Sequence, residues 1–216
     1  MSAVAPSISP IFGRILSASQ IEDAILDLMQ KWFPTYLAEI ERQTGMRAGT
    51  LPAPENYINR NSFETLEGEP MPKVVVISEG LATAPGQTNG HVYRATWRLG
   101  VGVATAAKTE EVCNRMVKGY GAAVRGLMLN KMGDANIDGI VAINWMEETY
   151  PSIAIPSPLM LFKAANILFT IDVEDVVHRY GGPPAPSRAV PPDWTEVDTV
   201  DIELDIVPDD TEFPTS

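Results

Sequence analysis

Few residues in this chain belong to the types that do acid–base or metal chemistry, and they are scattered. The two histidines are His91 and His178, and neither has a partner at the spacing of a metal site or a catalytic pair. We interpret both as surface or boundary residues. The single cysteine, Cys113, falls in the first turn of a predicted helix, where the helix dipole would lower the pKa of a thiol. Because no base lies near it in the sequence, a structural role is favoured.

Two groups of carboxylates could bind a hard cation such as Ca²⁺ or Mg²⁺, which prefers oxygen ligands. One group is Glu147-Glu148, and the other is Asp172, Glu174 and Asp175. Acidic side chains are common throughout this acidic chain, so a solvated surface is favoured over a metal site for both groups. A small metal-dependent enzyme that uses these clusters remains the alternative of a different class.

Two glycine pairs resemble parts of phosphate-binding loops. Gly100-Val-Gly102 lacks the third glycine of a dinucleotide-binding loop and lies within a predicted strand, whereas Gly119-Tyr-Gly121 lies inside a predicted helix. Neither pair is expected to hold phosphate. The sequence therefore predicts no catalytic, cofactor-binding or metal-binding residues, and we expect that the chain is not an enzyme.

The first element that must position any site is a helix near residue 19. Ser19-x-x-Glu22 matches a capping box, in which a hydroxyl and a carboxylate satisfy amides left free at a helix start. An apolar stripe at helical spacing follows, made of Ile21, Ala24, Ile25, Leu28, Met29 and Trp32. Pro34 either kinks this helix or begins a second one, and Gly45 is expected to end it. Residues 45–72 contain four prolines and are predicted to form a long loop.

Strands are predicted in two pairs on either side of a second helix. Residues 73–78 and 92–103 are joined by turn residues 84–90 into a hairpin, and residues 93–103 alternate apolar with polar or small side chains. Thr109 is expected to cap the helix over residues 109–129. Residues 139–146 and 166–177 follow as strands, separated by the Pro-rich loop 150–158. The order α-β-β-α-β-β predicts an α+β fold, a mostly antiparallel four-stranded sheet with helices packed on one face.

The charge of the chain is concentrated at its C-terminal end. Residues 181–216 contain nine Asp or Glu and one Arg, so they hold −8 of the formal −12. They open with the Pro-rich run 181–186, which is typical of an extended linker. We therefore divide the chain into an N-terminal extension (1–16), a single α+β domain (17–180) and an acidic C-terminal arm (181–216). The acidic balance argues against sequence-independent binding of nucleic acid.

One short pattern inside the acidic arm is typical of a strand. Val200, Ile202, Leu204 and Ile206 alternate with Asp201, Glu203 and Asp205. Such a segment can add to the exposed sheet edge of another molecule, or fold back on its own domain. The apolar runs elsewhere are too short to cross a bilayer, and no secretory signal is apparent. A single cysteine fits a reducing compartment, so we expect a protein made in the cytoplasm that does not bind membranes.

The arrangement of these elements resembles the tail terminator proteins of long-tailed, siphovirus-type bacteriophages, particularly those that infect actinobacteria. The resemblance rests on the capped helix 19–32, the hairpin 73–78 and 91–103, the helix 109–129, and the strands 139–146 and 166–177. It covers roughly three-quarters of the chain and rests on arrangement rather than on a short motif. The loop 45–72 and the acidic arm go beyond the family pattern.

The resemblance implies a homo-oligomeric ring, typically hexameric, in the tail or neck of the virion. Such a ring caps the tail tube, ends its polymerisation and presents a surface to the head-side connector protein, and its lumen can admit genome DNA. The resemblance implies no catalytic residues and no cofactor. We expect the helix 109–129 and a sheet edge to form the lateral contacts, and the loops 45–72 and 84–90 and the arm to reach axial partners. Another connector, neck or minor tail protein is the alternative.

Overall fold

The computed structural model describes residues 15–59, 70–88, 92–154, 159–174 and 176–177. The chain divides into two compact units, Met1–Gly182 and Pro183–Ser216. All described residues belong to the first unit, so the predicted strand at 200–206 lies outside them, as do His91 and His178. No helix in the described part of the chain is long and apolar enough to cross a membrane.

The first helix, α1 (Ala18–Thr44), begins two residues earlier than the predicted capping box would place it. Its N-cap is Ser17, whose hydroxyl accepts from the Gln20 amide while the Gln20 side chain accepts from the Ser17 amide. The box therefore uses Gln20 and not Glu22, whose carboxylate instead accepts a hydrogen bond from the Ser78 amide in the strand β2 (Lys73–Leu81). Gly45 ends the helix as predicted, with a left-handed φ of 67° that favours glycine.

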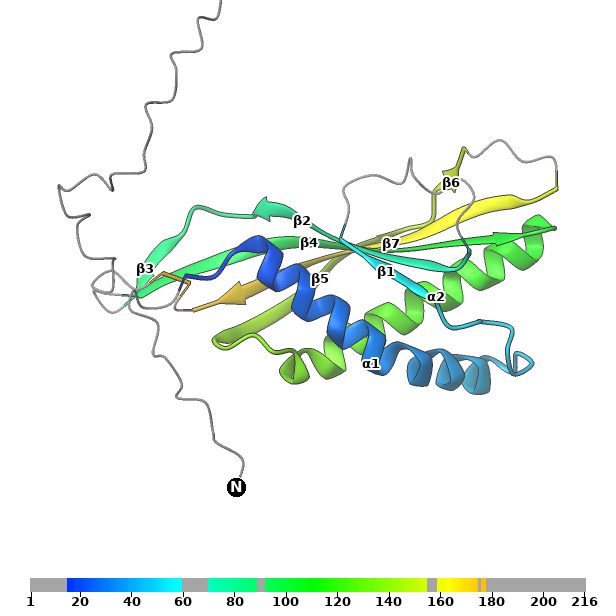
Figure 1. Ribbon diagram of the computed structural model, residues 1–216, viewed down its shortest axis with the longest axis horizontal. Helices are drawn as coiled ribbons and strands as arrows, with labels where there is room; N and C mark the ends of the chain where they lie inside the picture. The colour runs from blue at the N-terminus through cyan, green and yellow to red at the C-terminus, as the bar shows by residue number, and fades with distance from the viewer. Residues whose placement is uncertain (1–14, 60–69, 89–91, 155–158, 175, 178–216) are drawn as a thin grey trace, which may run out of the picture. The chain divides into compact units, whose positions relative to one another are not determined.

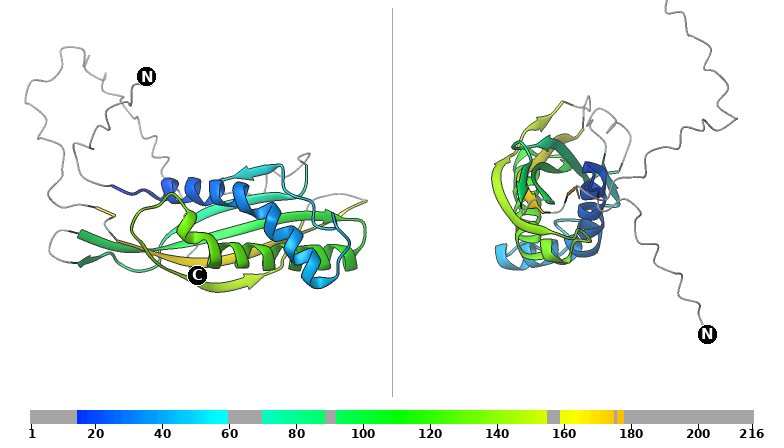
Figure 2. Two further views of the ribbon diagram at one scale, coloured as in Figure 1. Left: turned by 90° about the horizontal axis from the view of Figure 1, so that it is seen from below. Right: turned by 90° about the vertical axis from the view of Figure 1, so that its left-hand side faces the viewer.

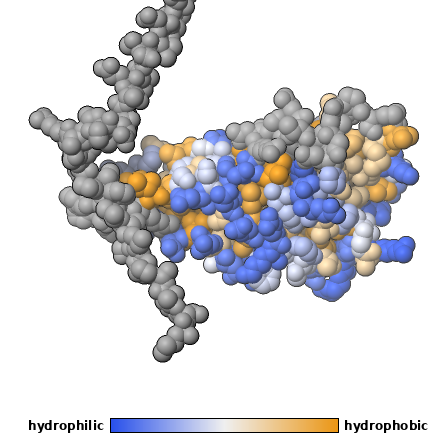
Figure 3. Space-filling model, in the orientation of Figure 1, coloured by the Kyte–Doolittle hydropathy of each residue, from blue (hydrophilic) through white to orange (hydrophobic). Residues whose placement is uncertain are grey.

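Pro34 lies inside α1 and does not begin a second helix. A proline removes one backbone hydrogen bond and bends a helix without necessarily breaking it. The axis of α1 changes direction part-way along its length (Figure 2). The predicted apolar stripe is buried, with Ile21, Ile25 and Met29 fully so. Hydrophilic residues cover much of the opposite face, which is seen in Figure 3.

The strands run in chain order on either side of the second helix, α2 (Glu110–Lys131), and its short 3₁₀ extension (Met132–Asp134). Before α2 come β1 (Asn56–Ile58), β2 (Lys73–Leu81), β3 (Gly86–Thr88) and β4 (Val92–Ala107). After it come β5 (Ile140–Thr149), β6 (Ser152–Ile153) and β7 (Leu161–Val173). Thr109 caps α2, as predicted, by accepting from the Val112 amide.

The fold is α+β, but the predicted four-stranded antiparallel sheet is wrong in detail. The strands of the described residues form one seven-stranded mixed sheet whose main order is β1-β2-β4-β7-β5, with β3 on β4 and β6 on β7. The β1–β2 pair is parallel, whereas the other pairs are antiparallel. The additional strands β1, β3 and β6 have only two or three residues each, too few to show a period of two in the sequence.

Both helices cover the same face of the sheet (Figures 1 and 2). The alternation predicted for β4 is observed, because Leu99, Val101 and Val103 are buried against the helices. β7 contributes Ile167, Phe169 and Ile171 to the same core. The opposite face of the sheet has no helix among the described residues, and β4 presents Gly100 and Gly102 there.

Glycines in α2 let this helix approach its neighbours closely. A Cβ at Gly119 would lie 2.8 Å from a methyl carbon of Leu51, which comes from the long segment after α1. The Tyr120 hydroxyl also donates to the Pro52 carbonyl of that segment, at 2.9 Å. The described start of the predicted loop 45–72 is therefore packed into the core beside α2.

Candidate assembly surface

The two edges of the sheet differ in how they are covered. At one edge, β1 pairs with residues 73–75 of β2, and the Glu22 carboxylate accepts from the Ser78 amide at 2.6 Å. At the other edge lies β5, which pairs along its length with β7 and ends the order of the main sheet. No strand lies beyond β5 in the part of the chain that the structure describes (Figure 1). Its outward backbone groups can therefore pair with another chain.

Large apolar side chains are exposed along this same edge. Val141 is 49% exposed, Trp145 46% and Met146 58%. Val141 and Met146 fall where the β5–β7 register shifts, so each is displaced from regular pairing. From α2, the Arg125 guanidinium lies over the Trp145 ring at 4.7 Å. We call Val141, Trp145 and Met146 the β5 edge patch.

Beneath the edge, a polar cluster fixes β5 against α2. Arg125 forms an ion pair with Glu148, and the Tyr150 hydroxyl donates to the same carboxylate. Burial first, and then the hydrogen bond to Glu148, raise the pKa of Tyr150 to about 12. Gly121 makes room for this cluster, because a Cβ there would lie 2.9 Å from Glu148 Oε1. The edge strand is therefore held in a fixed position relative to α2. A fixed strand gives another chain a surface of defined shape to bind.

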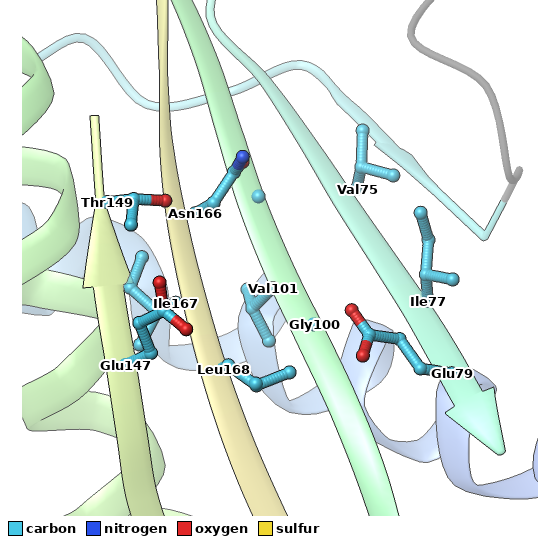
Figure 4. Close-up of a pocket in the computed structure, with 11 residues that line it drawn as sticks. Val75, Ile77, Glu79, Gly100, Val101, Glu147, Thr149, Asn166, Ile167 and Leu168 are labelled. Atoms are coloured by element: carbon cyan, nitrogen blue, oxygen red, sulfur yellow. The ribbon is translucent and has the colours of Figure 1, made fainter. Parts of the chain in front are cut away.

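A shallow hollow of about 290 Å³ lies on the open face of the sheet. Figure 4 shows its side chains rising from β2, β4, β7 and β5. Ile77 and Leu168 form apolar walls, Gly100 leaves the floor open, and the carboxylates of Glu79 and Glu147 contribute oxygen acceptors. The hollow therefore suits a group with an apolar stem and a hydrogen-bond donor.

The residues that the sequence singled out for chemistry do not converge on one site. Cys113 is fully buried, burial raises the pKa of its thiol, and its Sγ lies 3.5 Å from the Leu161 carbonyl oxygen. Glu147 and Glu148 point to opposite faces of β5, because they pair with consecutive residues of β7. Within the described ranges, no group of three or more His, Cys, Asp or Glu side chains is placed to hold a metal ion.

Asp172 in β7 stabilises the sheet by binding side chains of the neighbouring strand β4. Its carboxylate accepts from the Thr96 hydroxyl at 2.5 Å and from Arg94 at 2.7 Å. These two contacts, the hydrogen bond from Thr96 foremost, hold the pKa of Asp172 below its ordinary value. Glu174 lies 3.9 Å from the same Arg94 and is more exposed. Asp175, the third member of the predicted acidic group, lies outside the described residues.

The exposed edge was not located by sequence reasoning, which predicted only that some sheet edge would make lateral contacts. The run 139–146 does not show which strands pair on either side of it, so the open edge could not be found from that run alone. No family model matches the chain, and no curated protein sequence matches it either.

Proposed function

We propose that the chain is a structural virion protein, a tail terminator whose copies form a ring that caps the tail tube of a long-tailed phage. The observation that supports this proposal is the β5 edge patch, an open strand edge with large apolar side chains beside a helix. Exposed edges of this kind are unusual in monomeric proteins, which protect them or pair them.

A ring requires two unlike surfaces on each copy, because head-to-tail contacts close only if one surface fits another. In this proposal, β5 and the adjacent side of α2 form one lateral surface. The part of the segment 45–72 that follows β1, the loop 84–90 and the acidic arm reach the tail tube below or the head-side connector above. A terminator of this kind stops polymerisation because it matches the tube on one side only.

The first test is the oligomeric state of the full-length protein in solution. Native mass spectrometry and negative-stain electron microscopy should show a closed ring, with six copies expected from the family resemblance. A protein that stays monomeric at micromolar concentrations and forms no ring in the presence of tail tubes would contradict the proposal.

The second test applies to the phage that encodes the chain and uses particles assembled without this protein. Tubes of uncontrolled length would support the terminator function. Tails of normal length that fail to join heads would favour a connector or neck protein instead. Particles of normal length and normal attachment would overturn an assembly function altogether.

A further inference from the structure

The open edge of β5 has a stretch to which another strand can add in regular register. Register shifts between Ile140 and Ala142 and between Trp145 and Glu147 leave two regular parts, residues 142–145 and residues 147–149. Residues 142–145 carry no charge, and the Arg125 guanidinium lies over the Trp145 ring. Among the described residues, the opposite edge offers no comparable stretch, because β1 and the Glu22 carboxylate already engage β2.

The chain itself contains a segment whose chemistry fits this edge. Residues 200–206 alternate four apolar residues with three acids, so as a strand they would have one apolar and one acidic face. The described part of the chain ends at Val177, and 22 residues separate it from Val200. An extended linker of that length spans roughly 70 Å, enough to reach a neighbouring copy.

We propose that residues 200–206 of one copy add as an outer strand to β5 of the next copy in the ring. The inference rests on the proposed function and names the partner of its lateral surface. Strand addition supplies a head-to-tail contact, because the donated segment and the receiving edge are unlike surfaces on the same chain.

The two faces of β5 determine how the added strand is oriented. Trp145 lies on the helix side, where Arg125 covers its ring, and Asn144 lies on the opposite side, where its amide donates to Thr170. The apolar residues Ile202 and Leu204 therefore pack on the helix side, beside Trp145. Asp201, Glu203 and Asp205 then stand on the open side next to Asn144, and the nearest β5 carboxylate there is Glu147.

Cysteine cross-linking between two separately made chains tests this arrangement. One isotopically labelled chain carries Asn144→Cys, and an unlabelled chain carries Glu203→Cys. The wild-type Cys113 is fully buried, so the unsubstituted protein serves as the background control. After mixing and mild oxidation, we expect a cross-linked pair that contains one labelled and one unlabelled chain. Asp201→Cys and Asp205→Cys test the same face at neighbouring registers.

The matched control uses the other face of the same segment. Ile202→Cys and Leu204→Cys should cross-link to Asn144→Cys at least about tenfold less, because alternate residues of a strand point to opposite sides. Equal cross-linking from both faces would indicate a disordered encounter, and a reversed pattern would place the acids against α2. Either result would overturn the proposed pairing.

A second comparison uses assembly as its readout. Ile202→Asp with Leu204→Asp should raise the concentration needed for ring formation by about tenfold or more, because it removes the apolar face. The matched triple variant Asp201→Asn, Glu203→Gln and Asp205→Asn keeps the apolar face and should still assemble.

The failures of the two proposals can be told apart. Rings that form without any cross-link between labelled and unlabelled chains would overturn the strand addition and leave the terminator function standing. A cross-link only within a chain that carries both cysteines would show that the segment folds back on its own edge, which also overturns it. Cross-linked open chains without rings would support the strand addition and contradict the closed ring.

Discussion

At the scale of single residues, the polar cluster beneath β5 places a nearly buried carboxylate beside one cation. The Glu148 side chain is 9% exposed, and Arg125 is the cation that pairs with it. Removing one partner of such a pair leaves the other charge without compensation, which costs more than the pair itself contributes. The edge strand therefore depends on this contact for its position on α2.

We predict that Arg125→Met destabilises the protein by about 2 kcal/mol, less than for a fully buried pair because Arg125 is partly exposed to solvent. Urea unfolding followed by circular dichroism measures this change. Arg115→Met is the matched control on the same helix, because its pair with Glu111 is exposed on both sides. Equal stability of the two variants would contradict the prediction that the ion pair between Arg125 and Glu148 stabilises the protein more than the exposed pair does.

Asp172 makes the stability of the folded protein depend on pH in the acidic range. Its pKa is lower in the folded protein than in the unfolded chain, so its contribution to stability is present above the unfolded pKa and is lost as the pH falls through the folded value. We predict that Asp172→Asn lowers the free energy of unfolding by about 2 kcal/mol at neutral pH and that the difference shrinks toward low pH.

Unfolding curves for the wild type and Asp172→Asn between neutral and acidic pH test this prediction. Glu174→Gln is the control, because Glu174 is more exposed and lies farther from Arg94. A difference between wild type and Asp172→Asn that stays constant with pH would show that the carboxylate charge is not what stabilises the sheet.

At the scale of elements, the glycines in α2 lower its helix propensity but allow neighbouring side chains to pack closely against it. Gly121 is surrounded by Glu148 and Tyr150, with a Cβ expected 3.0 Å from the Tyr150 hydroxyl oxygen, whereas a Cβ at Gly126 would meet the Tyr36 ring at 3.4 Å. The first site cannot take a methyl group without movement of the polar cluster, and the second needs a much smaller adjustment.

We therefore predict that Gly121→Ala destabilises the protein by about 1–3 kcal/mol, because overpacking outweighs the gain in helix propensity. Gly126→Ala should be close to neutral or stabilising by up to about 1 kcal/mol. Thermal and urea unfolding of both variants measure this difference. A stabilising Gly121→Ala would mean that the cluster of Glu148 and Tyr150 is free to move away.

The elements that sequence reasoning predicted well are those with long periodic patterns or a defined cap. The burial of Leu99 and Val103 in β4, the Thr109 cap and the Gly45 stop follow from local physics. Local physics does not determine which serine caps α1. Ser17 and Ser19 both offer a hydroxyl, and each is followed three residues later by a side chain, Gln20 or Glu22, that could complete a capping box. The choice of Ser17 frees Glu22 for β2, a contact between residues 56 positions apart that no local pattern reveals.

The order of the strands and the position of the open edge could not be predicted from the sequence for the same reason. Two strands that alternate equally well can pair in several orders, and only packing against α1 and α2 selects one. The β5 edge patch exists because β7, and not β5, occupies the inner position. No signal within residues 140–149 states which neighbour a strand will have.

At the scale of the whole molecule, assembly should depend on the β5 edge while the fold of each copy does not. We predict that Met146→Lys prevents ring formation, because a charge on an exposed edge opposes strand pairing and apolar contact. The circular dichroism spectrum should stay unchanged, since Met146 is 58% exposed in the single chain. Gln30→Lys on the exposed side of α1 is the control for an added charge.

Size-exclusion chromatography with light scattering reports the oligomeric state of both variants. If Met146→Lys forms rings as stable as those of the wild type, β5 is not part of the interface. Loss of rings in Gln30→Lys as well would show that the added charge acts on the ring in general rather than at the edge.

The position of β7 has a consequence for the order in which the protein is made. β7 is the last strand of the sheet to leave the ribosome, yet it lies between β4 and β5 and is the strand with which both pair. A nascent chain that ends before residue 161 therefore exposes long unpaired edges on β4 and β5. Completion of the sheet must wait for translation to pass residue 173, and premature stops upstream of it should yield aggregated fragments rather than smaller folded proteins.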